Sequence, residues 1–453
     1  MLGLNKEVCR VAALPSDERV AGLKRIISRK TVQAVLRRCH PNQRYCKRLP
    51  RLFVVWFVIG MAIHSSDCYR QVFRWLHRRQ TQVPGATTLC EARQSVGVAP
   101  LRYLAAETVK LLATRETPNA FYCDMRLMAI DGFVLDLPDR PDLTRIFGRP
   151  QGGRAEGAFP QARVLALCEA GTHVMWKHQI KPIRCGEVTM APSLIRHLQA
   201  SMLLLWDRGF FSYALLKQVL AQGSHLLARL KKNLIFKVIR RYRDGSYLAK
   251  AYRSSADRNK DRGGIKVRII EYRLNDPGQT DSQERHRLMT TLLSPTQHPA
   301  KTLIELYHQR WEIEITIDEV KTHLRERPVL RSQTPAGVIQ EIEGLLLAHY
   351  VIRALMAEVA QKEGIDPRRL SFTGTLKILR CRMAECPKDA PGQREWYEDL
   401  LKEIATEKLP PRRDRINPRV IKRKMSKWAK KRAAHRNYPQ REKTFRQSID
   451  MLD

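Results

Sequence analysis

Two aspartates stand at places in this sequence where they could take part in binding a ligand. Asp131 follows the apolar run 127–130, and Asp207 follows the still more apolar run 202–206. Runs of this kind predict buried strands, and the carboxyl ends of strands in an open α/β sheet border the crevice where ligands bind. A lone aspartate there is more often a turn former or a helix cap. The occurrence of two at equivalent places favours a shared site.

A third carboxylate, Glu314, lies in a stretch with helical periodicity over residues 304–325. At about 100° per residue, Tyr307, Arg310 and Lys321 fall within about 40° of Glu314. A separate apolar stripe can pack on a core and comprises Leu306, Ile313, Ile317, Val320 and Leu324. Arg310 and Glu314 would form a salt bridge on any helix, but that pairing does not explain Tyr307 and Lys321. The helix is therefore predicted to present one carboxylate beside three groups that bind phosphate.

These side chains suit phosphoryl transfer. A phosphodiester is anionic and resists attack, and two Mg²⁺ ions roughly 4 Å apart can activate the attacking oxygen and stabilise the leaving one. Mg²⁺ prefers carboxylate oxygens, and a few such ligands leave positions for water and substrate. Asp318 is the only competing acid close to the stripe on the helix.

The charge of the chain points to a polyanionic partner. The 453 residues include 82 Lys and Arg against 45 Asp and Glu, a formal net charge of +37. Residues 412–446 alone hold 15 basic and 2 acidic residues, interleaved with Trp428, Tyr438 and Phe445. Such composition favours nucleic-acid binding over a solubilising surface or a ribosome-like tail. We therefore predict a phosphoryl-transfer enzyme that acts on nucleic acid.

The elements that must position these residues change along the chain. Apolar spacing in the first 120 residues predicts an Arg-rich helical module, suited to DNA binding but also compatible with a plain helical scaffold. Short β-like runs follow, and helices resume near residue 301. The predicted domains are 1–120, helical and DNA-binding; 121–230, the first part of an α/β core; 231–300, a β-rich insertion; 301–365, the closing helices of the core; and 366–453, a basic C-terminal region.

The longest apolar run, residues 52–63, is too short to span a bilayer and predicts a buried helix. No secretory signal is recognisable at the start of the chain. We therefore expect a cytoplasmic protein without a membrane partner.

The pattern Tyr307-x2-Arg310-x3-Glu314-x6-Lys321 resembles the Tyr-Arg-Glu-Lys signature of the DDE transposases of the insertion-sequence-four family. WDRGFFS (206–212) is similar to the second-aspartate motif of that family, and IDGFVLDLPD (130–139) to the first. The segments GAFPQARVLALCEAGTH (157–173) and DGSY (244–247) also resemble it. The similarity covers about residues 35–435. Phe133 departs from the pattern, because the family usually has a small polar threonine there.

The resemblance implies an α/β fold with an RNase H-like core and a β-rich insertion, preceded by an all-helical N-terminal domain and followed by a basic helical tail. It implies that Asp131, Asp207 and Glu314 are catalytic and bind metal, with two Mg²⁺ ions expected and Mn²⁺ as an alternative. It also implies that Tyr307, Arg310 and Lys321 contact DNA phosphate near the scissile bond.

The implied activity is that of a bacterial transposase that cuts at the ends of its element and joins the 3′-hydroxyls to target DNA. The implied partners are double-stranded DNA, as inverted repeats and target, and a second copy of the chain in a homodimer. Two alternatives stay open: a metal-dependent nuclease on the same core, and an inactive transposase retained as a DNA-binding regulator.

Overall fold

The computed structural model describes residues 21–41, 49–76, 83–152, 155–231, 233–274, 285–387, 389–410 and 445–452. The chain forms two compact units, each described by itself below. Unit 1 comprises Met1–His197 and Glu312–Leu409, and unit 2 comprises Leu198–Trp311 and Pro410–Asp453. Nearly all of the polybasic segment predicted at 412–446 lies outside the described residues.

The first part of unit 1 is helical, as the apolar spacing predicts. The apolar run 52–63 forms helix α3 (Arg51–Ile63), which is buried from Phe53 onward. No helix in the described part of the chain combines the length and apolar character needed to cross a membrane. The neighbouring helices are η1 (Ala21–Arg25), α2 (Arg29–Cys39), α4 (Tyr69–Leu76), α5 (Ala86–Val96) and α6 (Ala99–Thr108).

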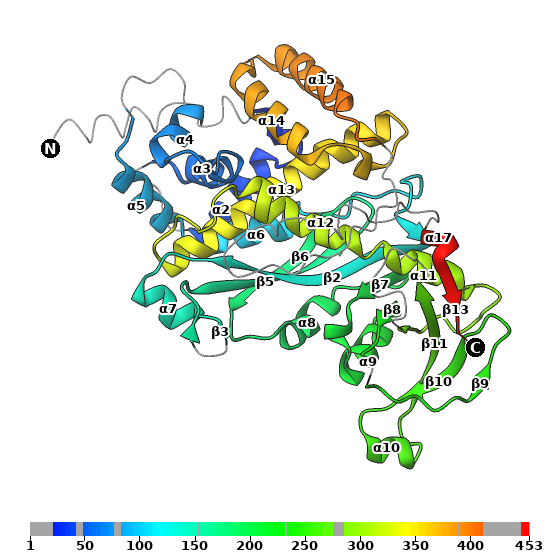
Figure 1. Ribbon diagram of the computed structural model, residues 1–453. Helices are drawn as coiled ribbons and strands as arrows, with labels where there is room; N and C mark the ends of the chain where they lie inside the picture. The colour runs from blue at the N-terminus through cyan, green and yellow to red at the C-terminus, as the bar shows by residue number, and fades with distance from the viewer. Residues whose placement is uncertain are drawn as a thin grey trace, which may run out of the picture. The chain divides into compact units, whose positions relative to one another are not determined.

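An antiparallel sheet in the order β6-β5-β2 forms the centre of unit 1 (Figure 1). It consists of β2 (Met125–Asp136), β5 (Gln161–Glu169) and β6 (Val174–Pro182), and the short β1 (Phe121–Tyr122) pairs with β2. Asp131 lies opposite Ala166, which lies opposite His178, so these three residues share one face of the sheet. The elements between β2 and β5 are α7 (Pro141–Phe147), β3 (Gln151–Gly152) and β4 (Ala155–Glu156).

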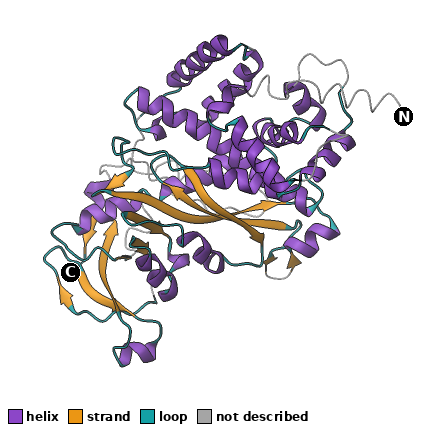
Figure 2. Cartoon of the chain, turned by 180° about the vertical axis from the view of Figure 1, so that it is seen from behind, coloured by secondary structure: helices purple, strands orange, loops and turns teal. Residues whose placement is uncertain are grey.

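Helices cover both faces of this sheet, as Figure 2 shows from behind. On the face of Asp131, His178 reaches Glu343 of the long helix α13 (Pro335–Lys362), with 2.9 Å between Nε2 and the carboxylate. On the opposite face, Gly132 lies against Glu187, the first residue of α8 (Glu187–Ile195). The sheet is therefore the middle layer of a three-layer arrangement.

The chain returns to unit 1 near the start of α12 (Trp311–Asp318) and continues as a π-helix, η3 (Glu319–Leu324), before α13. The described residues after α13 are largely helical in the part of the chain where the sequence predicted a basic region. They form η4 (Pro367–Arg369), α14 (Phe372–Arg382), η5 (Met383–Glu385) and α15 (Ala390–Thr406).

Unit 2 is built on a sheet in the order β7-β8-β12-β11-β10-β9. β7 (Met202–Trp206) runs parallel to β8 (His225–Arg229), and α9 (Tyr213–Ala221) makes the crossover between them. The remaining strands pair antiparallel, and the C-terminal strand β13 (Ile449–Met451) pairs with β11. The other elements are η2 (Arg208–Phe210), β9 (Arg240–Arg241), β10 (Tyr247–Ala251), α10 (Ser255–Asn259), β11 (Ile265–Leu274), β12 (His286–Thr290), α11 (Ala300–His308) and α17 (Phe445–Ser448).

Candidate active site

Asp131 lies inside strand β2, so the prediction that it follows the end of a strand is wrong. The strand continues to Asp136 because Phe133 and Leu135 go on alternating into the core. Asp131 is half-buried, and its Oδ1 accepts a hydrogen bond of 2.8 Å from the backbone N–H of Gly132. Phe133, which departs from the family pattern, is buried on the same face of the strand as Asp131.

The prediction of one continuous helix over residues 304–325 is also wrong. Helix α11 ends at His308, α12 begins at Trp311, and the last part is the π-helix η3. The interruption falls between Tyr307 and Glu312, and each of these side chains is held by a tertiary contact that local periodicity cannot reveal. Because a π-helix turns less per residue than an α-helix, the calculated angle between Glu314 and Lys321 does not hold.

Asp131 and the π-helix approach the same buried thiol in unit 1. Cys168 of β5 is fully buried. Burial raises the pKa of its thiol, and the negative charges of Asp131 and Glu319 raise it further. Both carboxylates are therefore close enough to Cys168 to act on it electrostatically. Glu314 is half-buried five residues before Glu319, and Lys321 is half-buried two residues after Glu319. The segment that carries Glu314 and Lys321 thus lies over the face of the sheet that presents Asp131.

A buried ionic cluster holds this segment. His173, in the turn between β5 and β6, contacts Glu312 at 2.8 Å through Nε2 and Glu319 at 3.1 Å through Nδ1. From α13, His349 Nε2 lies 2.9 Å from Glu319, and Arg353 Nε donates to the same carboxylate at 2.9 Å. Burial opposes the charged form of Glu319, but the charge of Arg353 and the contacts with His173 and His349 hold its pKa well below the usual range. Glu319 therefore stays charged as the anchor of the π-helix.

In unit 2, the structure brings Asp207, Tyr307 and Arg310 together. Asp207 is the half-buried residue that follows β7, as predicted, and it precedes η2. The Tyr307 hydroxyl donates to the backbone carbonyl of Trp206 at 3.2 Å, and the Arg310 guanidinium lies 6.0 Å from the Tyr307 ring centre. Burial raises the pKa of Tyr307, the charge of Arg310 opposes that rise, and the charge of Asp207 adds to it. Tyr307 is therefore a neutral hydrogen-bonding group next to Asp207.

The predicted site residues are divided between the units. Unit 1 holds Asp131, Glu314 and Lys321, and unit 2 holds Asp207, Tyr307 and Arg310. Across the described residues, no group of three His, Cys, Asp or Glu side chains is placed so that it could hold a metal ion. The chemistry of the donors still fits a hard cation, because Asp131, Asp207 and Glu314 are all half-buried carboxylates. Glu312 and Glu319, by contrast, are buried and engaged by cations.

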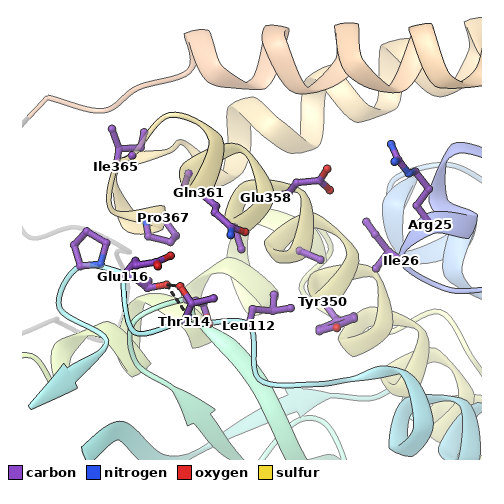
Figure 3. Close-up of a pocket in the computed structure, with 17 residues that line it drawn as sticks. Arg25, Ile26, Leu112, Thr114, Glu116, Tyr350, Glu358, Gln361, Ile365 and Pro367 are labelled. Atoms are coloured by element: carbon purple, nitrogen blue, oxygen red, sulfur yellow. Dashed lines mark hydrogen bonds between the residues drawn. The ribbon is translucent and has the colours of Figure 1, made fainter. Parts of the chain in front are cut away.

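A cavity beside α13 in unit 1 contains none of these residues. The cavity, of about 370 Å³, lies between α13 and residues 112–118, with Tyr350, Glu358 and Gln361 on one side and Leu112 and Thr114 on the other (Figure 3). Its lining mixes polar and apolar side chains and offers no cluster of carboxylates. The cavity is therefore separate from the candidate site.

Sequence reasoning missed the ionic cluster. His173 ends the segment 157–173 that resembles the family, but no short-range pattern connects it with Glu312 or with Arg353. Helical spacing places Glu312 and Glu319 away from the stripe of Glu314, but it does not show that they are buried and therefore need partners.

Comparison with known proteins defines the class of this protein. The sequence profile described as "Transposase DDE domain" matches residues 122–351, which is more than half of the chain. A second profile, "Insertion element 4 transposase N-terminal", matches residues 17–106. The chain belongs to the DDE transposases, within the insertion-sequence-four family. Its core is accordingly RNase H-like, and the class uses divalent metal ions.

Two relatives come from Escherichia coli strain K12. The transposase InsG for insertion sequence element IS4 is 28% identical over 394 residues, covering 84% of this chain and 87% of the relative. The putative transposase InsZ is 27% identical over 201 residues, covering 43% of this chain and 66% of the relative. This chain is therefore a bacterial insertion-sequence transposase, an enzyme of DNA cleavage and strand transfer.

Among solved structures, the chain is similar to a piggyBac transposase in a synaptic complex with hairpin DNA. The TM-score is 0.44 with 12% sequence identity, and the similarity covers 86% of this chain and 85% of the other.

Proposed function

We propose that Asp131, Asp207 and Glu314 are the metal-binding catalytic carboxylates of this transposase and that they hold two Mg²⁺ ions. The observation that carries the proposal is the grouping of Asp207, Tyr307 and Arg310 in unit 2. A carboxylate, a phenol and a guanidinium gathered at the end of a buried strand suit a phosphodiester. The half-buried Asp131 and Glu314 in unit 1 supply the remaining hard oxygen ligands.

The metal ions supply charge neutralisation and activation of the attacking oxygen when they are bound. Arg310 and Lys321 balance the negative charge of the phosphate next to the scissile bond. Tyr307, which stays neutral, donates a hydrogen bond and fixes the position of the strand end that carries Asp207. The ionic cluster around Glu319 keeps the helical segment with Glu314 and Lys321 in place on the sheet.

The substrates are the inverted repeats at the ends of the element and the target DNA. Water first cleaves the phosphodiester at the end and leaves a 3′-hydroxyl, whose oxygen then attacks a phosphorus atom of the target. A new phosphodiester forms as the target bond breaks. We infer that a homodimer pairs the two ends, because each end needs its own set of carboxylates.

The deciding experiment is cleavage and strand transfer on linear DNA with the flanking inverted repeats, with and without Mg²⁺. Wild type is expected to join DNA only with metal, and Glu314→Gln to lose joining while it still binds DNA. The matched control is Glu305→Gln in α11, where the carboxylate pairs with the exposed Arg446 at 3.1 Å and joining should persist.

Asp207→Ala should likewise abolish cleavage and spare DNA binding. Cleavage that survives this change would remove the three-carboxylate proposal. Metal-dependent cutting without joining would favour a nuclease on the same core. Tight binding without cutting would favour a retired transposase that acts as a regulator.

A further inference from the structure

We propose that a groove at the edge of strand β6, whose lining includes none of the three proposed catalytic carboxylates, binds the phosphate backbone of DNA. The proposal rests on the proposed function only in taking DNA as the substrate. The β6 groove is a hollow of about 370 Å³ in unit 1 that wraps around the outer strand of the β6-β5-β2 sheet. Its lining includes residues 176–181 of β6, Arg102 of α6, Glu343 of α13 and His197, which follows α8.

Cations crowd one side of the β6 groove. Burial lowers the pKa of the half-buried Lys177, and burial together with the charges of Lys177 and Arg196 lowers the pKa of His197. Within the described part of the chain, neither Lys177 nor Lys181 pairs with a carboxylate. Like charges held this close repel one another, and a bound phosphate would relieve that repulsion.

The single acid in the groove does not supply that relief. Glu343 is buried, and its carboxylate already lies 2.9 Å from His178 Nε2 and 3.6 Å from Arg102. The groove therefore retains a net positive charge, contributed by Lys177, Lys181 and the nearby Arg196. Its charge complements a polyanion.

A β-bulge fixes the position of one of these cations. The register between β5 and β6 shifts at Leu167 and Cys168, which leaves Trp176 as the additional residue on β6. The Lys177 ammonium lies 5.2 Å from the centre of the Trp176 ring. The rings of His197 and Trp176 form a T-shaped pair with 6.4 Å between their centres. A bulge commonly redirects side chains near functional sites. The indole holds the ammonium in place, so less side-chain entropy is lost when a phosphate binds.

The spacing of the two lysines fits a duplex. Four residues along a strand separate Lys177 from Lys181 by about 13 Å, the axial length of roughly four base pairs. Both residues can therefore contact phosphates of one DNA segment. Lysines and a bulge on an outer strand can also serve only to prevent pairing with another chain, and the experiment must separate these two roles.

The test is equilibrium binding of the full chain to a duplex that carries the inverted repeat, in EDTA to prevent cleavage. Affinity is measured between about 50 and 200 mM salt, where phosphate contacts dominate the salt dependence. The double variant K177Q K181Q should bind more weakly and lower the slope of log affinity against log salt by about two. Trp176→Leu should weaken binding with little change in the slope, because both charges remain.

The control variant K402Q K408Q removes the same charge from residues that already pair with acids, Asp399 at 3.0 Å and Glu363 at 2.9 Å. Its slope should equal that of wild type. Circular dichroism and the melting temperature check that each variant is folded. An unchanged slope for K177Q K181Q with increased self-association would overturn the inference and assign the lysines to edge protection. Wild type that binds no DNA would instead refute the proposed function.

Discussion

His173 is the residue on which the candidate site depends most without belonging to it. Its backbone φ of 61° lies in the left-handed region, which costs a residue other than glycine roughly 1–3 kcal/mol. In that conformation its fully buried ring bridges Glu312 and Glu319, one on each side of Glu314 in the sequence. Its contacts therefore offset the backbone strain and hold the helical segment at two points.

We expect His173→Ala to destabilise the protein by about 3–5 kcal/mol, because the change leaves buried carboxylates short of a partner. Urea denaturation measures the loss. If the protein still folds, cleavage should also require more Mg²⁺ than in wild type, because Glu314 is less firmly held.

His323→Ala is the matched control on η3. This histidine pairs with Asp318 at 3.2 Å near the surface, and its removal should cost less than about 1 kcal/mol. Equal losses for the two variants would contradict the role assigned to His173.

At the scale of elements, α13 determines how the helical layer of unit 1 packs. A Cβ atom at Gly344 would lie 2.7 Å from Val58 Cγ1 and 2.9 Å from the Val58 carbonyl oxygen, so α13 and α3 approach closely there. The same helix carries Glu343, His349 and Arg353 toward the sheet and the π-helix. Packing at Gly344 therefore affects the elements that surround the carboxylates.

Gly344→Ala should lower the free energy of unfolding by up to about 2 kcal/mol, since an overpacking cost of about 1–3 kcal/mol outweighs the gain of about 1 kcal/mol in helix propensity. Gly60→Ala in α3 is the control, because its nearest neighbour is a flexible leucine side chain at 3.4 Å. Gly60→Ala should leave the free energy of unfolding unchanged or raise it slightly. Chemical denaturation of the two variants compares their free energies of unfolding directly. If Gly344→Ala stabilised the protein, α13 and α3 would be able to move apart without cost.

At the scale of the whole molecule, the large positive charge makes stability sensitive to further protonation. His64 at the end of α3 is 5% exposed and stacks on Trp75 with 5.1 Å between ring centres. Burial, and then the charge of Arg380, lowers the pKa of His64 to about 4, whereas a histidine in the unfolded chain has a pKa of about 6.5. Between these two values the unfolded state binds a proton that the folded state excludes.

The free energy of unfolding should therefore fall as the pH drops from about 6.5 to about 4, by about 3 kcal/mol from this histidine. His64→Asn should show a shallower loss over that window, as measured by urea denaturation at several pH values. His323→Asn, at the surface, should follow the wild-type dependence. If the free energy of unfolding of His64→Asn depends on pH as that of wild type does, His64 is not the group responsible for the loss of stability.

The sequence alone was sufficient for what local patterns encode. The apolar spacing predicted the helices before residue 120, the run 202–206 predicted β7, and motif spacing identified the transposase family. These features depend on periodicity and on residue types at short separations, which a sequence displays directly. The roles of Asp131, Asp207 and Glu314 stay predictions.

Only the tertiary structure decided the features that depend on contacts between distant residues. It placed Asp131 inside β2, broke the signature helix between Tyr307 and Glu312, and turned residues 319–324 into a π-helix. It also gathered His173, Glu319 and Arg353, which lie far apart in the chain, into one buried cluster. Buried charges gain stability only from partners that folding brings to them, so no local pattern could have shown this arrangement.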